Sequence, residues 1–344
     1  MTTVTVNASK TYEIRIGEGL LQSLGSEIQK LGKVQSICIV SESNVFPLYG
    51  DAAEKSLREA GFRVVCYVFP AGEERKNAAT YLELLNFLAE HKLTRSDLIV
   101  ALGGGVVGDM AGFAAATYLR GIRFVQVPTT LLAAVDSSVG GKTAIDLPAG
   151  KNLVGAFWQP SLVICDTLLL NTLPDDVFRD GCAEVIKYAI LYDSAFFSYL
   201  QNSGLAFDRE WVIRRCVEMK RDVVLQDEFD TGERMKLNLG HTIGHGVEAR
   251  SQFNLSHGKA VAIGMAIVCR AGNCKDTQKI LDVLIQFGLP TSCEYSSSEL
   301  IDYTLSDKKR SGNSVKLIIP QEIGNCNIIP TSVDRLQSFI EAGL

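Results

Sequence analysis

The distribution of hydrophobic residues changes near residue 170. Before that point, short apolar runs rich in β-branched residues predict strands over 34–43, 62–70, 97–105, 123–130 and 161–166. The segments 52–61, 77–91 and 108–121 between them have the helical spacing of apolar residues. Nearly continuous apolar strands that alternate with helices are typical of a parallel sheet covered on both faces. We therefore expect an N-terminal Rossmann-like, doubly wound α/β domain.

The second half of the chain has a mainly helical pattern. Apolar residues recur at helical spacing over 175–193, 211–228, 237–251 and 257–272, and only 315–320 and 325–330 resemble strands. We divide the chain into an α/β domain over 1–172 and a mainly helical domain over 173–344. No proline-rich or serine-rich linker separates them. We therefore expect a cleft between the domains, with little independent motion.

Composition and charge narrow the class of protein. A chain of 344 residues that is 47% hydrophobic can bury a large core. The net charge of −5, without a basic tract, argues against nucleic acid as a partner. No apolar run has the length of a membrane span and no secretory leader is evident, so we expect a cytoplasmic protein. The nine cysteines lack a C-x-x-C pair, which favours reduced core thiols.

Two glycine-rich segments resemble phosphate-binding motifs, and only the first has the required pattern. Gly103, Gly105 and Gly108 form G-x-G-x-x-G between a predicted strand and a predicted helix, where backbone N–H groups can approach a pyrophosphate. The acidic residue that normally follows about 20 positions later is absent, so either another nucleotide-binding geometry or a plain glycine turn is indicated. GGKT at 140–143 is not a P-loop, because Asp136 stands where glycine is required.

A polar cluster follows this second segment. Its charged and amide side chains lie among glycines and could converge. A solvated loop is the usual interpretation of alternating charge, but the adjoining glycines and apolar flanks argue against it here. The cluster consists of Asp136, Lys142, Asp146, Lys151 and Asn152.

Three of the four histidines lie between residues 237 and 258, and only His91 lies elsewhere. His241 and His245 would share one face of a helix, but the glutamate of the H-E-x-x-H zinc motif is missing. His257 follows a polar turn that could return the next helix beside the first. Glu184, beside Lys187 in an apolar helix, is the candidate acidic ligand, because a buried carboxylate needs a partner. Each histidine alone could be a core residue, whereas three together favour a metal site.

Seven segments together resemble the 3-dehydroquinate synthases, and they occur in order through nearly the whole chain. They are LGGGVVGDMAGFAAATYLRG, VPTTLLAAVDSSVGGKTAID, GKNLVGAFWQP, AEVIKYA, LNLGHTIGHGVEA, HGKAVAIGM and SDKKRSG. The resemblance implies an NAD-dependent, zinc-containing homodimer, with cobalt able to occupy the same ligands. It also implies a lyase that converts 3-deoxy-D-arabino-heptulosonate 7-phosphate, a small sugar phosphate, into 3-dehydroquinate and phosphate.

The resemblance also implies roles for individual residues. The metal ligands are Glu184, His241 and His257. The catalytic residues are His245, which handles a proton and contacts the substrate phosphate, together with Asp230 and Lys187. The implied cofactor contacts are Glu42, Asn44, Gly72, Glu73, Lys76, Gly104, Gly105, Val106, Asp109, Thr129, Thr130, Lys142, Lys151, Leu169, Thr172 and Leu173. The implied substrate contacts are Arg120, which reaches the partner subunit's site, Asp136, Lys142, Asn152, Lys187, Lys220, Arg234, Asn238, His245 and one of Lys308 or Lys309.

Three positions depart from the family pattern. Asp230 replaces a usual glutamate, Glu42 a common aspartate, and Asp180 a usually neutral residue. Asp230 matters most, since its shorter side chain reaches about one methylene less far.

Three competing functions are considered. A metal-dependent polyol dehydrogenase would also pair a nucleotide domain with a helical metal domain, but the cluster of lysines and arginines suits a doubly anionic substrate better. A related sugar-phosphate cyclase would use glucose 6-phosphate or sedoheptulose 7-phosphate. A nucleotide-binding protein without catalytic activity would leave the histidines and lysines unexplained.

Overall fold

The computed structural model describes residues 1–252, 254–305, 310–311 and 314–344. The chain forms two compact units. The sheet unit comprises Met1–Leu173 and Arg209–Phe229, and the helical unit comprises Pro174–Asp208 and Asp230–Leu344. The first division between them falls one residue from the boundary drawn from the sequence. The helix over 209–226 returns to the sheet unit, which hydrophobic periodicity alone did not indicate.

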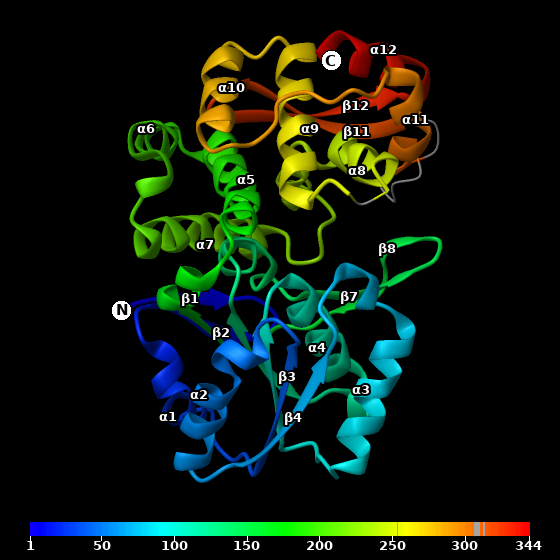
Figure 1. Ribbon diagram of the computed structural model, residues 1–344. Helices are drawn as coiled ribbons and strands as arrows, with labels where there is room; N and C mark the ends of the chain where they lie inside the picture. The colour runs from blue at the N-terminus through cyan, green and yellow to red at the C-terminus, as the bar shows by residue number, and fades with distance from the viewer. Residues whose placement is uncertain (253, 306–309, 312–313) are drawn as a thin grey trace. The chain divides into compact units, whose positions relative to one another are not determined.

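A seven-stranded sheet forms the centre of the sheet unit, with strand order β1-β2-β9-β6-β5-β3-β4 (Figure 1). All neighbouring pairs are parallel except β1 and β2, which are antiparallel. The five predicted strands are confirmed as β3, β4, β5, β6 and β9, whereas β1 and β2 were not predicted. Their bounds are β1 Thr2–Asn7, β2 Thr11–Gly17, β3 Ser36–Glu42, β4 Arg63–Phe69, β5 Leu98–Gly103, β6 Arg123–Pro128 and β9 Leu162–Asp166.

Helices cover both faces of this sheet, so the doubly wound arrangement is confirmed. In β3, Ile37 and Ile39 face one core cluster, formed with α1 and α2, while Cys38 and Val40 face the other, formed with α3 and α4. This alternation explains why the strand reads as one continuous apolar run. The helices are α1 Leu24–Gln29, α2 Phe46–Glu59, α3 Ala78–Glu90 and α4 Gly105–Thr117.

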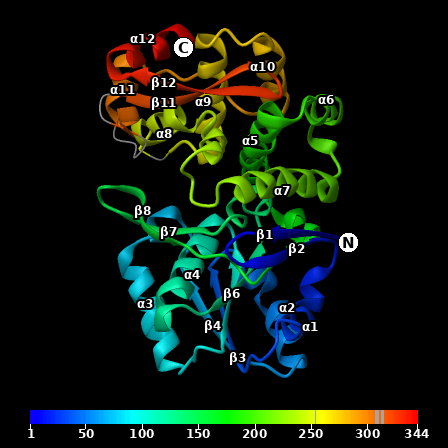
Figure 2. The same ribbon diagram turned by 180° about the vertical axis from the view of Figure 1, so that it is seen from behind.

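Two further elements complete the sheet unit. The polar cluster expected in loops lies largely on an antiparallel hairpin, β7 Lys142–Leu147 and β8 Gly150–Phe157. Helix α7, Arg209–Gln226, packs against β1 and β2. Figure 2 shows α7, β1 and β2 from the opposite side.

The helical unit has the mainly helical character that its periodicity predicts. Its helices are α5 Asp175–Tyr192, α6 Ser194–Ser203, α8 His241–Arg250, α9 His257–Ala271, α10 Thr277–Gln286, α11 Ser297–Leu305 and α12 Val333–Gly343. The two strands predicted near the C-terminus are β11 Ser314–Glu322 and β12 Asn325–Ser332, joined by β10 Arg310–Ser311 in a small antiparallel sheet.

Glycines allow α5, α8 and α9 to approach one another closely. A Cβ added at Gly264 in α9 would lie 1.9 Å from the carbonyl oxygen of Gly240, just before α8. One added at Gly258 would lie 2.0 Å from the carbonyl oxygen of Asp180 in α5. No side chain fits at such distances, so glycine at these two positions determines how near the three helices can lie.

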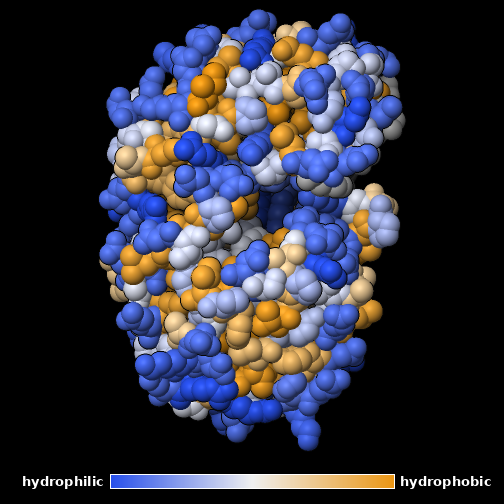
Figure 3. All heavy atoms as spheres, viewed as in Figure 1, coloured by the Kyte–Doolittle hydropathy of each residue, from blue (hydrophilic) through white to orange (hydrophobic). Residues whose placement is uncertain are grey.

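The exposure of apolar side chains and the burial of the cysteines are those of a globular protein. Apolar residues reach the surface among polar ones on the face shown in Figure 3. Exposed large apolar side chains include Leu48, Leu82 and Ile285, and such exposure is common in folded proteins. All nine cysteines are free thiols, and only Cys66 and Cys293 are partly exposed, as expected for reduced core residues. Among the described residues, no helix combines the length and the apolar content needed to span a membrane.

We predict that Gly264→Ala destabilises the helical unit. The added methyl group would overlap the Gly240 carbonyl, and overpacking of this kind typically costs about 1–3 kcal/mol. A lowered midpoint in thermal unfolding of the metal-free protein would show this effect. The matched control is Gly105→Ala, whose Cβ would come no closer than 3.4 Å to Ser137 Oγ. Equal midpoints for the two variants would contradict the packing argument.

Candidate active site

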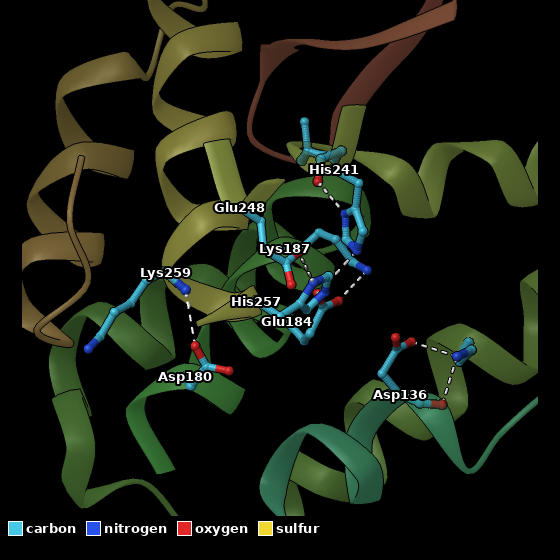
Figure 4. Close-up of polar contacts among 10 residues, drawn as sticks. Asp136, Asp180, Glu184, Lys187, His241, Glu248, His257 and Lys259 are labelled. Carbon is cyan, nitrogen blue, oxygen red and sulfur yellow. Dashed lines mark hydrogen bonds and ion pairs between the residues drawn. The ribbon is translucent and has the colours of Figure 1, made fainter. Parts of the chain in front are cut away.

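A carboxylate and two imidazoles meet in the interior of the helical unit. Glu184 lies in α5, while His241 and His257 are the first residues of α8 and α9. The Nε2 atom of His241 lies 3.3 Å from Glu184 Oε1, and the Nε2 atom of His257 lies 3.5 Å from the same oxygen. Figure 4 shows the three side chains pointing toward one another. One atom from each lies within 4.8 Å of the others, so the set could hold a metal ion.

The other ring nitrogen of each histidine is held by the protein. Nδ1 of His241 donates to the carbonyl oxygen of Leu239 at 3.1 Å. Nδ1 of His257 lies 3.4 Å from Oε2 of Glu248 in α8. These contacts direct both Nε2 atoms toward Glu184, as metal-binding histidines in proteins are usually oriented. Two imidazole nitrogens and one carboxylate are also a common protein ligand set for catalytic zinc.

The charge of Glu184 dominates the electrostatics of this cluster. The side chain is fully buried, and neither carboxylate oxygen accepts a hydrogen bond of good geometry, although Lys187 forms an ion pair with Oε2. Burial opposes the carboxylate charge, but Lys187 and the two imidazoles hold the pKa of Glu184 well below its usual value. The carboxylate is therefore ionised, with Oε1 directed toward the histidines, as a metal ligand requires.

The two histidines differ in charge without a metal. Burial lowers the pKa of His241 to about 3, so its imidazole is neutral. Burial also opposes a charge on His257, but the carboxylates of Glu184 and Glu248 raise its pKa to about 10. A metal binding at neutral pH must therefore displace a proton from His257.

His245 lies beside this cluster but outside the Glu184 group. Its ring centroid is 5.5 Å from that of His241 and 5.8 Å from that of His257. A nitrogen of His245 groups instead with Glu248 and His257. The geometry therefore favours His257 over His245 as the second nitrogen ligand. Helical spacing alone had allowed His245 to be a ligand beside His241.

The structure explains why an acidic residue can stand at position 180. Its Oδ1 accepts a hydrogen bond from the backbone N–H of Lys259 at 3.1 Å, in the first turn of α9 (Figure 4). An acidic side chain is favourable at a helix N-terminus, because the first N–H groups have no partner within the helix. The acid at this unusual position thus anchors the helix that begins with His257.

In the sheet unit, the predicted cofactor contacts gather where parallel strands end. Glu42 ends β3, Glu73 follows β4, Gly104 follows β5, Thr129 and Thr130 follow β6, and the 169–173 turn follows β9. Ligands of such sheets usually bind at this edge. Gly104 precedes α4, and a Cβ there would lie 3.1 Å from Thr130 Cγ2, so a larger residue would require Thr130 to shift.

A buried lysine organises this edge. Lys76 Nζ lies 2.6 Å from Asp109 Oδ2 and donates to Asn152 Oδ1 at 2.5 Å. Burial opposes its charge, but the surrounding carboxylates, Asp109 foremost, raise the pKa of Lys76. Asp146 accepts from the backbone N–H of Asn152 at 2.6 Å, where Asn152 has a left-handed φ of 53°. Lys151 pairs with Glu73 at 3.5 Å.

The other predicted residues lie in different parts of the chain. Lys220 in α7 donates to Asp136 Oδ1 at 2.6 Å, and Asp136 lies in a single π-helical turn, Ala133–Ser137. Arg234 is buried in the helical unit, where Asn238 and Asp230 also lie. Arg120 lies between the end of α4 and the start of β6. It is therefore at the amino ends of the parallel strands, whereas the predicted cofactor contacts are at their carboxyl ends. Lys308 and Lys309 lie outside the described residues.

Glu248 was missed by sequence reasoning, and the role of Asp146 was only partly anticipated. Glu248 was assigned no function, although an acid inside an apolar helix was the signal used for Glu184. Asp146 was noted in the polar cluster, but its support of Asn152 depends on the β7–β8 hairpin, which the sequence did not predict.

Solved structures identify the class of enzyme to which this architecture belongs. The chain superposes on 2-deoxy-scyllo-inosose synthase complexed with carbaglucose-6-phosphate, NAD⁺ and Co²⁺ with a TM-score of 0.90, 26% identity and 100% coverage of both chains. The fold of this chain is thus that of the sugar-phosphate cyclases.

Sequence comparison then identifies the family. The family model for the 3-dehydroquinate synthase N-terminal region matches residues 66–180, and the C-terminal model matches 181–310. Similar curated proteins are the 3-dehydroquinate synthases of Pelobacter propionicus, 45% identical over 98% of each chain, and of Clostridium beijerinckii, 44% identical over 94% of this chain and 96% of the relative. The chain belongs to the 3-dehydroquinate synthase family.

We predict that His241→Ala and His257→Ala each lose tightly bound metal while keeping the fold. Each removes one of the three ligands that converge at Glu184 among the described residues, and the three come from separate helices. Elemental analysis after dialysis measures the metal, and far-UV circular dichroism checks the fold. The matched control is His91→Ala, which removes a histidine at the end of α3 in the sheet unit. Stoichiometric metal in purified His257→Ala would contradict the assignment.

Proposed function

We propose that this chain is a 3-dehydroquinate synthase of the shikimate pathway, with NAD and a zinc or cobalt ion as cofactors. It converts 3-deoxy-D-arabino-heptulosonate 7-phosphate into 3-dehydroquinate and phosphate by transient oxidation, phosphate elimination, re-reduction and intramolecular aldol closure. The observation that carries the proposal is the family match over 66–310. This range contains Glu184, His241 and His257, whose side chains converge in the structure. We also infer that it works in the cytoplasm as a homodimer, in which the exposed Arg120 reaches the partner subunit's site.

When bound, the cofactors would supply the chemistry that side chains cannot: Lewis-acid activation of the substrate's C5 hydroxyl by the metal, and reversible hydride acceptance by NAD. Glu184, His241 and His257 would hold the metal. The N-terminus of α4, with Gly104 and Gly105, would bind the NAD pyrophosphate. Glu42, Lys76 and Asp109 would surround the rest of the cofactor.

The anionic substrate requires cationic side chains at fixed positions. In the helical unit, the buried guanidinium of Arg234 can bind a carboxylate through two parallel hydrogen bonds, and Asn238 lies in the same short helix. In the sheet unit, Asp136 holds Lys220 at 2.6 Å and Lys76 holds Asn152 at 2.5 Å. Side chains held in this way lose little further conformational entropy when substrate binds.

Proton transfer is assigned to groups beside the metal ligands. Oxidation of C5 to a ketone acidifies the proton at C6, and its removal allows phosphate to leave. His245 lies one turn after His241 on α8, and its imidazole can donate to the phosphate and help move this proton. Lys187, paired with Glu184, keeps a positive charge next to the reacting centre. Asp230 is the further candidate proton acceptor.

The decisive assay follows phosphate and NADH together. Because hydride is taken up and returned in each turnover, the purified protein with metal, NAD and the heptulosonate phosphate should release phosphate without lasting NADH. Accumulated NADH would instead identify a polyol dehydrogenase. Phosphate release from glucose 6-phosphate or sedoheptulose 7-phosphate, with none from the heptulosonate phosphate, would identify another sugar-phosphate cyclase.

We predict that His245→Ala keeps its metal and its NAD affinity but loses about 10²–10⁴-fold in the rate of phosphate release, the usual contribution of general acid–base catalysis. A transient NADH signal in single turnover should persist, because the first hydride transfer does not need this imidazole. His91→Ala serves as the control for a histidine distant in sequence from the cluster. Loss of metal from His245→Ala, to the extent seen for His241→Ala, would show that His245 is a ligand.

A further inference from the structure

Glu248 is a second buried carboxylate next to the metal ligands, and the proposed mechanism gives it no role. It lies in α8, seven residues after His241 and three after His245, so all three side chains share one face of the helix. Only 4% of the residue is exposed. Its Oε2 lies 3.4 Å from Nδ1 of His257, the first residue of the following helix (Figure 4).

This contact determines which nitrogen of His257 can bind a metal. A neutral imidazole carries a proton on one nitrogen and a lone pair on the other. A carboxylate at Nδ1 accepts from N–H there and cannot accept from a lone pair, so the lone pair is placed on Nε2. That atom faces Glu184 Oε1 at 3.5 Å. The same carboxylate restricts rotation of the ring about its bond to Cβ.

The two histidines are oriented by acceptors of different strength. His241 donates to the neutral carbonyl of Leu239, whereas His257 faces a charged carboxylate. A charged acceptor withdraws the Nδ1 proton more strongly and makes Nε2 a stronger donor to a metal. His257 also needs the stronger support, because its side chain is 32% exposed and that of His241 only 12%.

His245, Glu248 and His257 also lie close enough together to be considered as a second cation site. That arrangement would require a metal on Nδ1 of His257 in addition to one on Nε2. The neutral ring would then have to give up its remaining proton, the one that Nδ1 offers to the Glu248 carboxylate. The geometry therefore favours one metal per chain, with Glu248 outside its ligand set.

We propose that Glu248 is a positioning residue for the metal centre: its carboxylate keeps the proton of His257 on Nδ1 and directs Nε2 toward the metal held with Glu184. This inference rests on the proposed metal site, but it does not depend on the identity of the substrate.

The experiment measures Zn²⁺ and Co²⁺ affinity of Glu248→Ala and Glu248→Gln by competition with a chromophoric chelator, without substrate or NAD. Loss of such an orienting carboxylate typically weakens metal binding by about 10–100-fold, which we expect for Glu248→Ala. Glu248→Gln should lose less, because its amide oxygen can still accept from Nδ1 while the negative charge is absent. Glu299→Gln is the matched control, since Glu299 pairs with Arg250 of the same helix at 2.6 Å.

A second readout reports the tautomer directly. The chain has only four histidines, so ¹⁵N-histidine NMR of the metal-loaded protein can be assigned by substitution. We expect His257 to show a protonated Nδ1 and a metal-bound Nε2 in the unmutated protein and in Glu299→Gln. In Glu248→Ala we expect this signature to be broadened or replaced, a change that a purely structural role would not produce.

Several results would overturn the inference. Glu248→Ala with unmutated affinity and an unmutated ¹⁵N signature would show that Glu248 does not act on His257. Two tightly bound metals in the unmutated protein, one of them lost in Glu248→Gln, would make Glu248 a ligand. If metal binds as expected but no phosphate is released from the heptulosonate phosphate, the proposed function fails while the role of Glu248 stands.

Discussion

The buried charge of Glu184 is the constraint on which the helical unit depends. A carboxylate without solvent costs several kcal/mol unless opposite charges or donors compensate it. Here the compensation comes from Lys187 one turn later and from two imidazoles on other helices. The positions of α5, α8 and α9 are therefore linked through one side chain. The same concentration of charge and nitrogen donors is what makes the site suitable for a metal ion.

Close packing makes that convergence possible. Side chains as short as glutamate and histidine can meet only if their helices are near, and Gly258 and Gly264 remove the methyl groups that would separate the backbones. Asp180 adds a hydrogen bond to the start of α9, next to His257. Packing and chemistry are thus coupled, because a change that separates the helices also separates the ligands.

Lysine paired with a carboxylate recurs in both units. Lys76 pairs with Asp109, Lys187 with Glu184 and Lys220 with Asp136, and all three lysines are buried. Each pair keeps a cation dehydrated and in place, which would be costly without the acid. Such preorganised cations suit an enzyme whose proposed substrate and cofactor both carry negative charge, since little reorganisation is required when the anion arrives.

Local patterns in the sequence were sufficient to predict the parallel sheet and to identify Glu184 as a functional residue. Continuous apolar strands predicted the parallel sheet, because a strand covered on both faces has no polar side. Glu184 was identifiable as an acid inside an apolar helix. The family resemblance supplied residue roles, and the structure brings Glu184, His241 and His257 together.

The tertiary structure alone decided which side chains meet. Spacing allowed His245 to join His241, and only the packing of α9 against α5 and α8 brings His257 to Glu184 instead. The return of α7 to the sheet is likewise long-range, because Arg209–Gln226 packs against β1 and β2 at the start of the chain. Hydrophobic periodicity records which face of an element is buried. It does not record which distant element covers that face, because the choice depends on packing shape and charge summed over the whole chain.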